Sequence, residues 1–489
     1  MRAYDRLKTA FHRVACLEEA ASILNWDAAA MMPEGGAQAR GEQLAALAGL
    51  AHECLCAPEL AEALKAAGGL EGWDARNLDL MREAHLRATA LPRALVEARV
   101  RAGRTCETLW RAARRENDFP AVRAALEEVV RLTREAAAVL GQALGLSPYD
   151  ALMSQYQRGI GAAEAEAIFT RYETFLEKAL PQAEALQARR ARVPLPPGPY
   201  PQAAQAALAR NLAEAAGLDF RTARLDVSAH PFCGGTPTDI RITTRYDEAD
   251  FCVALMSVLH ETGHALYERN LPRAWARQPV GAAAGMAVHE SQSLILEMQV
   301  VRSDAYLAYL APRAAAAFAR PVTAEGLRYR LRRVERSFIR VEADELTYPA
   351  HVLLRFRLER ALLSGDLAVA DLPAAWNEGF GRLIGLTPPD DARGCLQDIH
   401  WYDGMIGYFP SYTLGAMAAA QLMAAARAAL PELDTALARG DLAPLAGWLT
   451  THVHRHGASA DFNQILEAAT GAPLDPSWFE AHLTARYLS

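Results

Sequence analysis

Hydrophobic residues recur every three or four positions through most of the chain, the spacing that places them on one face of a helix. Residues 1–190 follow this pattern, with breaks at glycine and proline, and it returns from residue 250 to the C-terminus. Between them lies the most proline-dense stretch, 193–201, which cannot be helical because proline lacks a backbone N–H donor. The pattern predicts a mainly α protein with an N-terminal helical region (1–201) and a second region (202–489).

Residues 222–246 form the one segment that predicts β structure. Asp239, Arg241 and Thr243 alternate with isoleucines, so the three polar side chains share one face of a strand. The glycines and prolines of residues 230–238 suit a turn between this strand and the one before it. We therefore expect a small antiparallel β element within a helical protein.

The composition is that of an ordinary globular protein, with 51% hydrophobic and 22% charged residues. Its 51 Lys and Arg against 58 Asp and Glu give a net charge of −7, which offers no basic surface for nucleic acid. No apolar run approaches the ~18 residues of a membrane span. The N-terminus carries a charge every few residues, unlike a signal peptide, and the seven cysteines suggest no disulfide framework, so we expect a cytoplasmic protein.

The pattern H-E-x-x-H at residues 260–264 is the strongest candidate for chemistry. Its surroundings predict a helix that Asp250 can cap and that ends before Pro272. His260 and His264 lie one turn apart on one face, as two ligands of a single ion must. Glu261 projects beside them, where it can take a proton from a water molecule at the ion. Two ordinary histidines are the alternative, and we favour the metal site.

A catalytic site of this type needs a third protein ligand. A second helical segment begins near His289, and the candidates are His289, Glu290, Glu297 and Glu268. Glu268 lies one further turn along the first helix, where a straight helix carries it past the ion. Glu290 and Glu297 fall on one face, seven residues apart, so spacing alone does not separate them. We interpret Glu297 as a solvated or salt-bridged residue.

Six motifs together resemble the carboxypeptidase Taq family of zinc-type metallocarboxypeptidases. They stand in the family's order over residues 230–401. The motifs are HPF (His230–Phe232), DxRxT (Asp239–Thr243), HExxH (260–264), HESQ (His289–Gln292), IRxxAD (Ile339–Asp344) and GxxQDxHW (Gly394–Trp401). HExxH occurs in many peptidases, whereas the last two motifs together with HESQ are highly specific.

The resemblance implies a ligand set and a fold. It implies that His260, His264 and Glu290 bind the metal and that Glu261 acts as general base and then as acid. It also implies a helical fold similar to neurolysin and angiotensin-converting enzyme, a deep substrate groove and a homodimer. Zinc is the expected cofactor, and cobalt suits the same ligands.

A carboxypeptidase must recognise a free α-carboxylate, for which the planar fork of arginine is well shaped. Arg340 and Arg241 are the candidates. A predicted helix over 337–348 places Arg340 four residues before Asp344, so an ion pair between them is the structural alternative. Arg241 and Asp239 lie on the predicted strand, whose edge can pair with an extended peptide, and an Arg–Asp pair is again the alternative.

Further polar residues are candidates for supporting roles. The oxyanion of the reaction can accept from His400, Tyr412 or Tyr408. Asp344 and Asp398 are candidate carboxylate partners of the ligand histidines, and His230 and His289 can also assist or be purely structural. We treat the alternating cluster His452, His454 and His456 as a surface feature.

These observations predict a metal-dependent carboxypeptidase acting on peptides with a free C-terminus. Because six motifs must converge on one metal ion, we expect one large helical body whose N-terminal half forms a wall of the groove. A metallo-oligopeptidase or endopeptidase with the same chemistry is the alternative among enzymes. A helical peptide-binding protein with a structural metal is the alternative of another class.

Overall fold

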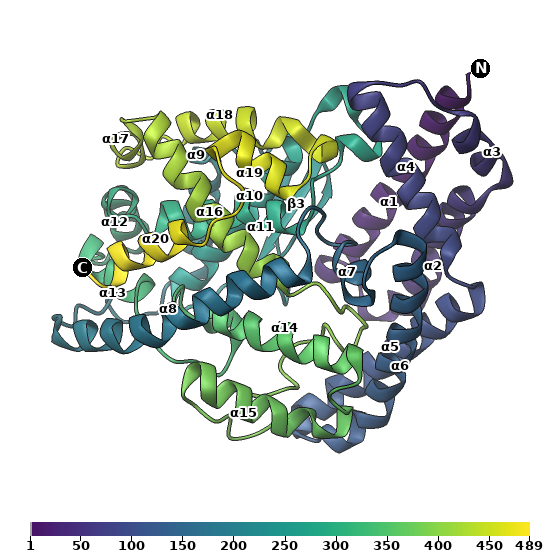
Figure 1. The fold of residues 1–489 in the computed structure, drawn as a ribbon. Coiled ribbons are helices and arrows are strands. Elements are labelled where there is room, and N and C mark those ends of the chain that lie inside the picture. The colour runs from purple at the N-terminus through teal and green to yellow at the C-terminus, as the bar shows by residue number, and fades with distance from the viewer. Residues whose placement is uncertain (1) are drawn as a thin grey trace. The chain divides into compact units, whose positions relative to one another are not determined.

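The computed structural model describes residues 2–489 and is mainly helical, as the hydrophobic pattern predicts (Figure 1). Contacts divide the chain into two compact units, each assembled from three segments. Unit 1 comprises the chain up to residue 88 with 191–331 and 418–474, and unit 2 comprises 89–190, 332–417 and 475–489. The predicted boundary at residue 201 does not coincide with this division.

Unit 1 contains the only strands among residues 2–489. Its elements are α1 (Ala3–Ala30), α2 (Ala37–Cys56), α3 (Pro58–Ala66), α4 (Gly72–Ala90), α9 (Gln202–Ala215), β1 (Ala223–Val227), β2 (Cys233–Thr236), β3 (Asp239–Thr244), α10 (Phe251–Asn270), α11 (Met286–Leu294), α12 (Asp304–Phe318), α13 (Ala324–Leu331), α17 (Leu433–Leu437), α18 (Ala443–His452) and α19 (Phe462–Thr470). Helix α16 (Pro410–Ala429) crosses from unit 2 into unit 1. No single helix in the described chain is long and apolar enough to cross a membrane, although the bent pair Glu34–Cys56 and Pro58–Ala66 passes by length and composition.

The small sheet of unit 1 is mixed, in the order β1-β3-β2, so the predicted antiparallel pairing is confirmed for β2 and β3 but not for β1. β1 runs parallel to β3, and β2 runs antiparallel to it. Within the stretch predicted as a turn, Cys233–Thr236 forms the strand β2, and a turn at residues 237–238 connects it to β3. Gly235 has a backbone φ of +89°, which glycine adopts readily. A Cβ on Gly235 would collide with the carbonyl oxygen of Asp239.

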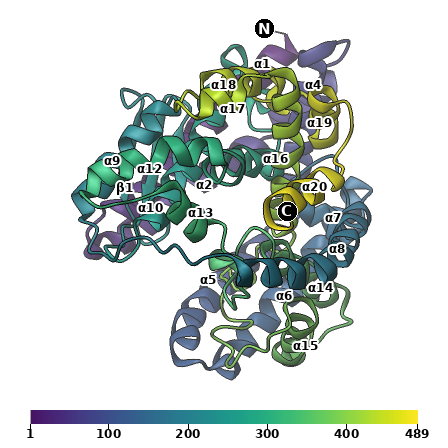
Figure 2. The same cartoon turned by 90° about the vertical axis from the view of Figure 1, so that its left-hand side faces the viewer.

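Helix α10 packs against β3 and β2, and α9 packs against α10 (Figures 1 and 2). Ile240 and Ile242 of β3 are almost fully buried. They pack with Val258 and Ala265 of α10 in one apolar cluster. The alternation in β3 and the helical period of α10 therefore meet in a common core, which fixes α10 beside the sheet.

Unit 2 is wholly helical among its described residues. Its elements are α5 (Arg93–Glu116), α6 (Phe119–Leu144), α7 (Pro148–Met153), α8 (Ala162–Arg189), α14 (Tyr348–Ser364), α15 (Leu372–Ile384) and α20 (Ser477–Tyr487). α5 lies along α6, and α14 contacts α6, α8 and α15. Asp118 caps α6 by accepting from the N–H of Ala121, and Gly145 ends it in the left-handed conformation.

The segment predicted as a helix over 337–348 is mostly a loop, so that prediction is wrong. Only Arg340–Glu342 forms a 3-10 turn, and α14 begins at Tyr348. The Asp344 carboxylate accepts hydrogen bonds from the backbone N–H groups of Leu346 and Thr347, at 2.9 and 3.1 Å. These local bonds stabilise a turn in place of a continuous helix.

A buried carboxylate, Glu359 on α14, holds three elements of unit 2 together. It accepts hydrogen bonds from Tyr149, from the indole N–H of Trp401 at 3.1 Å and from the backbone N–H of Gly407 at 3.2 Å. Burial raises the pKa of Glu359 from its usual value near 4.5 to about 7, although these donors oppose the shift. Below about pH 7 the folded protein therefore favours the neutral carboxyl, whereas an exposed glutamate is already ionised above about pH 4.5.

The first prediction concerns the pH dependence of stability. Between pH 4.5 and about 7 the folded state binds more protons at Glu359 than the unfolded chain does. The stabilising contribution of Glu359 to the free energy of unfolding is therefore fully present below pH 4.5 and is lost as the pH rises to about 7. The total loss is about 3 kcal/mol. Denaturant unfolding from pH 5 to 8 measures it as the difference between wild type and Glu359→Gln. The exposed Glu378→Gln is the control, and an equal pH slope in Glu359→Gln and wild type would contradict the assignment.

Candidate metal centre

Helix α10 places both histidines of the H-E-x-x-H pattern on one face. Asp250 caps the helix as predicted, accepting a hydrogen bond from the backbone N–H of Cys252 at 3.0 Å. His260 and His264 follow one turn apart, with ring centroids separated by 4.9 Å. Glu261 lies near His260 and is 6% exposed. The helix thus presents two imidazoles and a carboxylate at one place.

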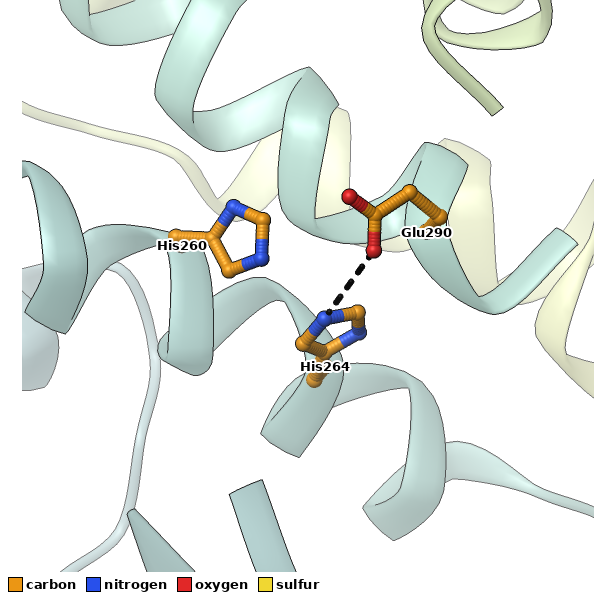
Figure 3. A group of neighbouring side chains, drawn as sticks. All are labelled: His260, His264 and Glu290. Carbon is orange, nitrogen blue, oxygen red and sulfur yellow. Dashed lines mark ion pairs between the residues drawn. The ribbon is translucent and has the colours of Figure 1, made fainter. Parts of the chain in front are cut away.

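Helix α11 brings Glu290 to the two histidines. Its Oε2 lies 3.5 Å from Nε2 of His264, and the three side chains point toward one another in Figure 3. One donor atom of each residue lies within 4.8 Å of the other two, and no other group of three potential ligands meets this condition in residues 2–489. The structure therefore selects Glu290 from the candidates that spacing left open.

The donor set fits a divalent metal ion. Two ligand atoms ~2.1 Å from a tetrahedral zinc ion lie ~3.4 Å apart, close to the His264–Glu290 separation of 3.5 Å. Two imidazoles and one carboxylate also leave a fourth position open, as catalytic sites require. The three residues would therefore hold the ion.

Hydrogen bonds behind the ligands fix both imidazole rings. Nδ1 of His260 lies 2.9 Å from Oε2 of Glu297, and Nδ1 of His264 lies 3.1 Å from the backbone oxygen of His289. Each Nδ1 therefore donates to an oxygen, which leaves Nε2 as the free donor atom for a metal. Glu297 also accepts from Arg302 at 2.9 Å.

Three carboxylates give this site a negative potential. Burial alone would lower the pKa of His260, but Glu297, Glu290 and Glu261 outweigh it and raise the pKa to about 10. Burial raises the pKa of Glu261 to about 7, with Glu290 adding to the effect. A site that stabilises a proton this strongly stabilises any cation, including a metal ion.

Comparison with known proteins agrees with this geometry. The sequence profile of the carboxypeptidase Taq (M32) metallopeptidase family matches residues 6–487. The chain belongs to this family. It is 36% identical to thermostable carboxypeptidase 1 of Thermus thermophilus, over 99% of this chain and 98% of that protein. Its structure matches metallocarboxypeptidase 1 of Trypanosoma cruzi with a TM-score of 0.97 and 37% identity, covering 100% of this chain and 99% of the other.

A second relative comes from another organism. Thermostable carboxypeptidase 1 of Pyrococcus furiosus is 32% identical, over 98% of this chain and 97% of that protein. Membership confirms the prediction of a metal-dependent carboxypeptidase that hydrolyses peptides. The endopeptidase alternative is not favoured.

Arg241 and Asp239 occupy the central strand β3, so the prediction that they lie on an edge strand is wrong. Both edges of β3 are already paired with neighbouring strands. The guanidinium of Arg241 forms two hydrogen bonds with Asp239 on its own strand, at 3.1 and 2.7 Å. It also stacks over Trp26, 4.1 Å from the ring centroid. These contacts occupy the guanidinium N–H groups that a substrate carboxylate would need.

Arg340 lies in unit 2 and pairs with Asp398, so the predicted alternative of an ion pair with Asp344 is wrong. Its Nη2 lies 2.9 Å from Oδ1 of Asp398, and Oδ2 of the same carboxylate lies 2.6 Å from Arg355. Burial alone would raise the pKa of Asp398, but the two guanidinium groups hold it well below its usual range. One carboxylate thus faces two arginines, and a positive charge remains.

His400, Tyr408 and Tyr412 form an aromatic group beside this arginine in unit 2. Nε2 of His400 lies 3.3 Å from the hydroxyl of Tyr412, and the Tyr408 and Tyr412 rings meet edge to face at 5.2 Å. The guanidinium carbon of Arg340 lies 4.8 Å from the Tyr412 ring centroid. Burial, with help from nearby arginines, lowers the pKa of His400 to about 4, so its imidazole is neutral.

The remaining candidates have varied surroundings. His289 stacks on His264 at 4.4 Å and binds Glu268 through Nε2 at 2.8 Å, so it supports a ligand histidine. His230 is exposed before β2. Asp398 binds arginines and Asp344 holds a turn; neither accepts a hydrogen bond from a ligand histidine among the described residues.

The sequence interpretation missed two supporting residues. Glu297 is salt-bridged as expected, but it also orients His260, and its seven-residue spacing from Glu290 was the available signal. It lies in a π-helical turn, Ile295–Val301, a feature often found at functional sites. His454 is buried and binds Gln292 of α11 at 2.9 Å, so its assignment to a surface cluster is wrong.

Gly263 sets the distance between the two ligand-bearing helices. It lies between the histidines on α10, where the backbone of α11 passes directly over it. A Cβ at this position would lie 2.5 Å from Cα of Ser293 and would also collide with the carbonyl oxygen of Gln292. Only glycine lets the helices approach closely enough for Glu290 to meet the histidines.

The second prediction follows from this contact. Gly263→Ala must separate α10 from α11, so we expect metal affinity to fall at least ~10-fold and stability by roughly 1–3 kcal/mol. Gly447→Ala on α18 is the matched control, because no atom lies within 4 Å of its added Cβ. Competitive chelator titration measures the affinity and denaturant unfolding the stability. Metal affinity equal in both variants would refute the role of Gly263.

Proposed function

We propose that this protein is a zinc carboxypeptidase that releases amino acids from the C-terminus of peptides, with zinc held by His260, His264 and Glu290. The convergence of these three side chains on one point is the observation that supports it most directly. Two imidazoles with one carboxylate are a common catalytic zinc set. Cobalt suits the same ligands, since loading is decided by availability and geometry as well as affinity.

In this proposal Glu261 is the general base. Bound zinc would supply Lewis acidity that polarises the scissile carbonyl and makes a water molecule more acidic. The Glu261 carboxylate takes the proton from the attacking water and later delivers it to the leaving amine. Its burial beside His260 supports this role, because a buried carboxylate with a pKa of about 7 exchanges protons readily near neutral pH.

Arg340 is the proposed anchor of the substrate's α-carboxylate. Its side-chain hydrogen bonds use three of its five N–H donors, two toward Asp398 and one toward Tyr348. The remaining donors and the unbalanced positive charge favour an added carboxylate. Arg355 is fully buried and supports the pair through Asp398. Arg241 is less suitable as the anchor because its guanidinium already donates two hydrogen bonds to Asp239.

The oxyanion that develops at the scissile carbonyl needs a hydrogen-bond donor. We assign this role to the hydroxyl of Tyr412, which the neutral imidazole of His400 orients at 3.3 Å. The ring of Tyr408 packs against both residues and restricts their movement.

The outer edge of β2 offers a place for the substrate backbone. Thr243 N donates to Phe232 O at 2.9 Å, so the peptide groups of Phe232 and Gly234 face β3 and those of Cys233 and Gly235 face away. Gly235 is met there by the hydroxyl of Ser22. We propose that the Cys233 peptide group pairs with an extended substrate, a mode of recognition that does not read sequence.

We also propose that the protein is a cytoplasmic homodimer. The family resemblance supports the dimer. The seven cysteines remain free thiols, which is compatible with a reducing compartment.

The third prediction tests the general base. Glu261→Gln keeps the size of the side chain but cannot accept a proton, so we expect turnover to fall ~10²–10⁴-fold while the metal stays bound. Turnover of a short peptide and metal content per chain are measured together. Glu325→Gln, an exposed change on α13, is the control. Near-normal turnover by metal-loaded Glu261→Gln would exclude the proposed base.

The fourth prediction separates the two candidate arginines. Arg340→Met removes a charge-assisted contact, so kcat/KM for a peptide with a free C-terminus should fall ~10–100-fold. Cleavage of the C-terminally amidated peptide, already slow, should change little. Arg241→Met is the matched control and should preserve the preference for free over amidated peptides. The opposite pattern would transfer the role to Arg241, and equal cleavage of both peptides by wild type would contradict the carboxylate anchor.

A further inference from the structure

Arg340 stands in a long loop of unit 2 that precedes α14. We call residues 335–347 the anchor loop; its regular part is the 3-10 turn Arg340–Glu342. The two ends of the anchor loop are joined, because the carboxylate of Asp344 accepts a hydrogen bond from the backbone N–H of Glu335 at 3.1 Å. Loops of this length whose ends lie close together are compact and frequently carry functional residues.

A buried carboxylate at the base of the anchor loop is bound by the last helix of unit 2. Glu345 is 1% exposed. Its Oε1 lies 2.7 Å from Nε2 of His482. Its Oε2 accepts hydrogen bonds from Nη1 of Arg486 at 2.8 Å and from the hydroxyl of Tyr487 at 2.9 Å. All three partners belong to α20, and a buried charge is costly unless it is paired, so Glu345 ties the anchor loop to α20.

The position of Glu345 reaches Arg340 through Tyr348. Residues 345–347 form the turn directly before α14, and Tyr348 is the first residue of that helix. The hydroxyl of Tyr348 accepts a hydrogen bond from Nη1 of Arg340 at 3.2 Å. A displacement of Glu345 therefore shifts a group that orients the guanidinium of Arg340.

A second support holds the anchor loop at Arg340 itself. Oε1 of Gln397 accepts from the backbone N–H of Arg340 at 2.9 Å, and Nε2 of Gln397 donates to the carbonyl oxygen of Phe338 at 3.0 Å. Asp398, the next residue, binds the guanidinium. The anchor loop is thus fixed at its middle by Gln397 and Asp398 and at its base by α20.

An ion pair on the exposed side of α20 provides a contrast. Arg171 of α8 forms two hydrogen bonds with the carboxylate of Glu480, at 2.8 and 2.9 Å, and its side chain is 47% exposed. This pair also links α20 to a neighbouring helix, but Glu480 is not one of the residues that bind Glu345. Loss of the pair would loosen α20 without removing a partner of the anchor loop.

We propose that Glu345 is a positioning residue for recognition of the substrate's α-carboxylate, and that α20 sets the place of Arg340 through it. The inference rests on the proposed role of Arg340 as the carboxylate anchor. Contacts between a guanidinium and a carboxylate depend on geometry, so a displaced anchor loop weakens the contact with a free C-terminus. Peptides without a free carboxylate lack that contact and do not feel the displacement.

The fifth prediction compares free and C-terminally amidated peptides in the full-length, metal-loaded enzyme. Arg486→Met removes a charge-assisted partner of Glu345, so kcat/KM for the free peptide should fall ~10-fold, mainly through a rise in KM. Cleavage of the amidated peptide should change little. Tyr487→Phe should act in the same direction by several-fold, and Arg486→Lys, which keeps the charge, should restore part of the loss. Glu345→Gln tests the same contact from the side of the anchor loop.

Arg171→Met is the matched control, because it removes an arginine ion pair from α20 and leaves the partners of Glu345 in place. We expect it to keep the wild-type preference for free over amidated peptides. Denaturant unfolding of each variant measures stability. A loss of stability lowers the fraction of active enzyme and therefore affects both peptides equally, whereas a displaced anchor loop affects only the free peptide.

Two results would overturn the inference. One is that Arg486→Met and Tyr487→Phe keep the wild-type preference for free peptides; the other is that they lower cleavage of both peptides by the same factor, as a purely structural contact does. Arg340→Met is measured in parallel. Loss of the preference in Arg340→Met but not in Arg486→Met rejects only the role of α20. Retention of the preference in Arg340→Met rejects the anchor, and this inference with it.

Discussion

The approach of α11 to α10 at Gly263 is the constraint on which the metal centre depends. A helix alone can align His260 with His264, but the third ligand must come from another element. That element must approach closely enough for a single ion to contact all three side chains. The missing side chain at Gly263 allows that approach, and His454 also binds α11 through the side chain of Gln292. The ligand geometry is therefore a consequence of backbone packing as much as of the ligands themselves.

Within each unit, buried charges are held by partners on neighbouring segments of the chain. Glu297 orients His260 and is itself held by Arg302, while Asp398 in unit 2 holds Arg340 and Arg355. Buried charges are costly unless paired, so each of these side chains has few alternative positions. This rigidity is what a catalytic site needs, since it avoids reorganisation during the reaction.

Several features could be read from local pattern because their cause is local. The span of α10, its Asp250 cap and the strand character of β3 follow from periodicity and capping chemistry. The predicted helix over 337–348 failed because Asp344 bonds to backbone groups just after it and forms a turn. The predicted antiparallel pairing holds for β2 and β3, whereas the parallel pairing of β1 with β3 was missed because alternation along one strand does not reveal which strands pair.

The sequence by itself determined the helical class, the placement of His260, Glu261 and His264 on one helix and, through its motifs, the family. Only the tertiary structure decided that Glu290 joins His260 and His264, that Glu297 stands behind them, and that Arg340 pairs with Asp398. It also showed that β3 is central and that His454 is buried. The physical reason is that spacing fixes which residues share a face, whereas partners from distant segments are chosen by how those faces pack.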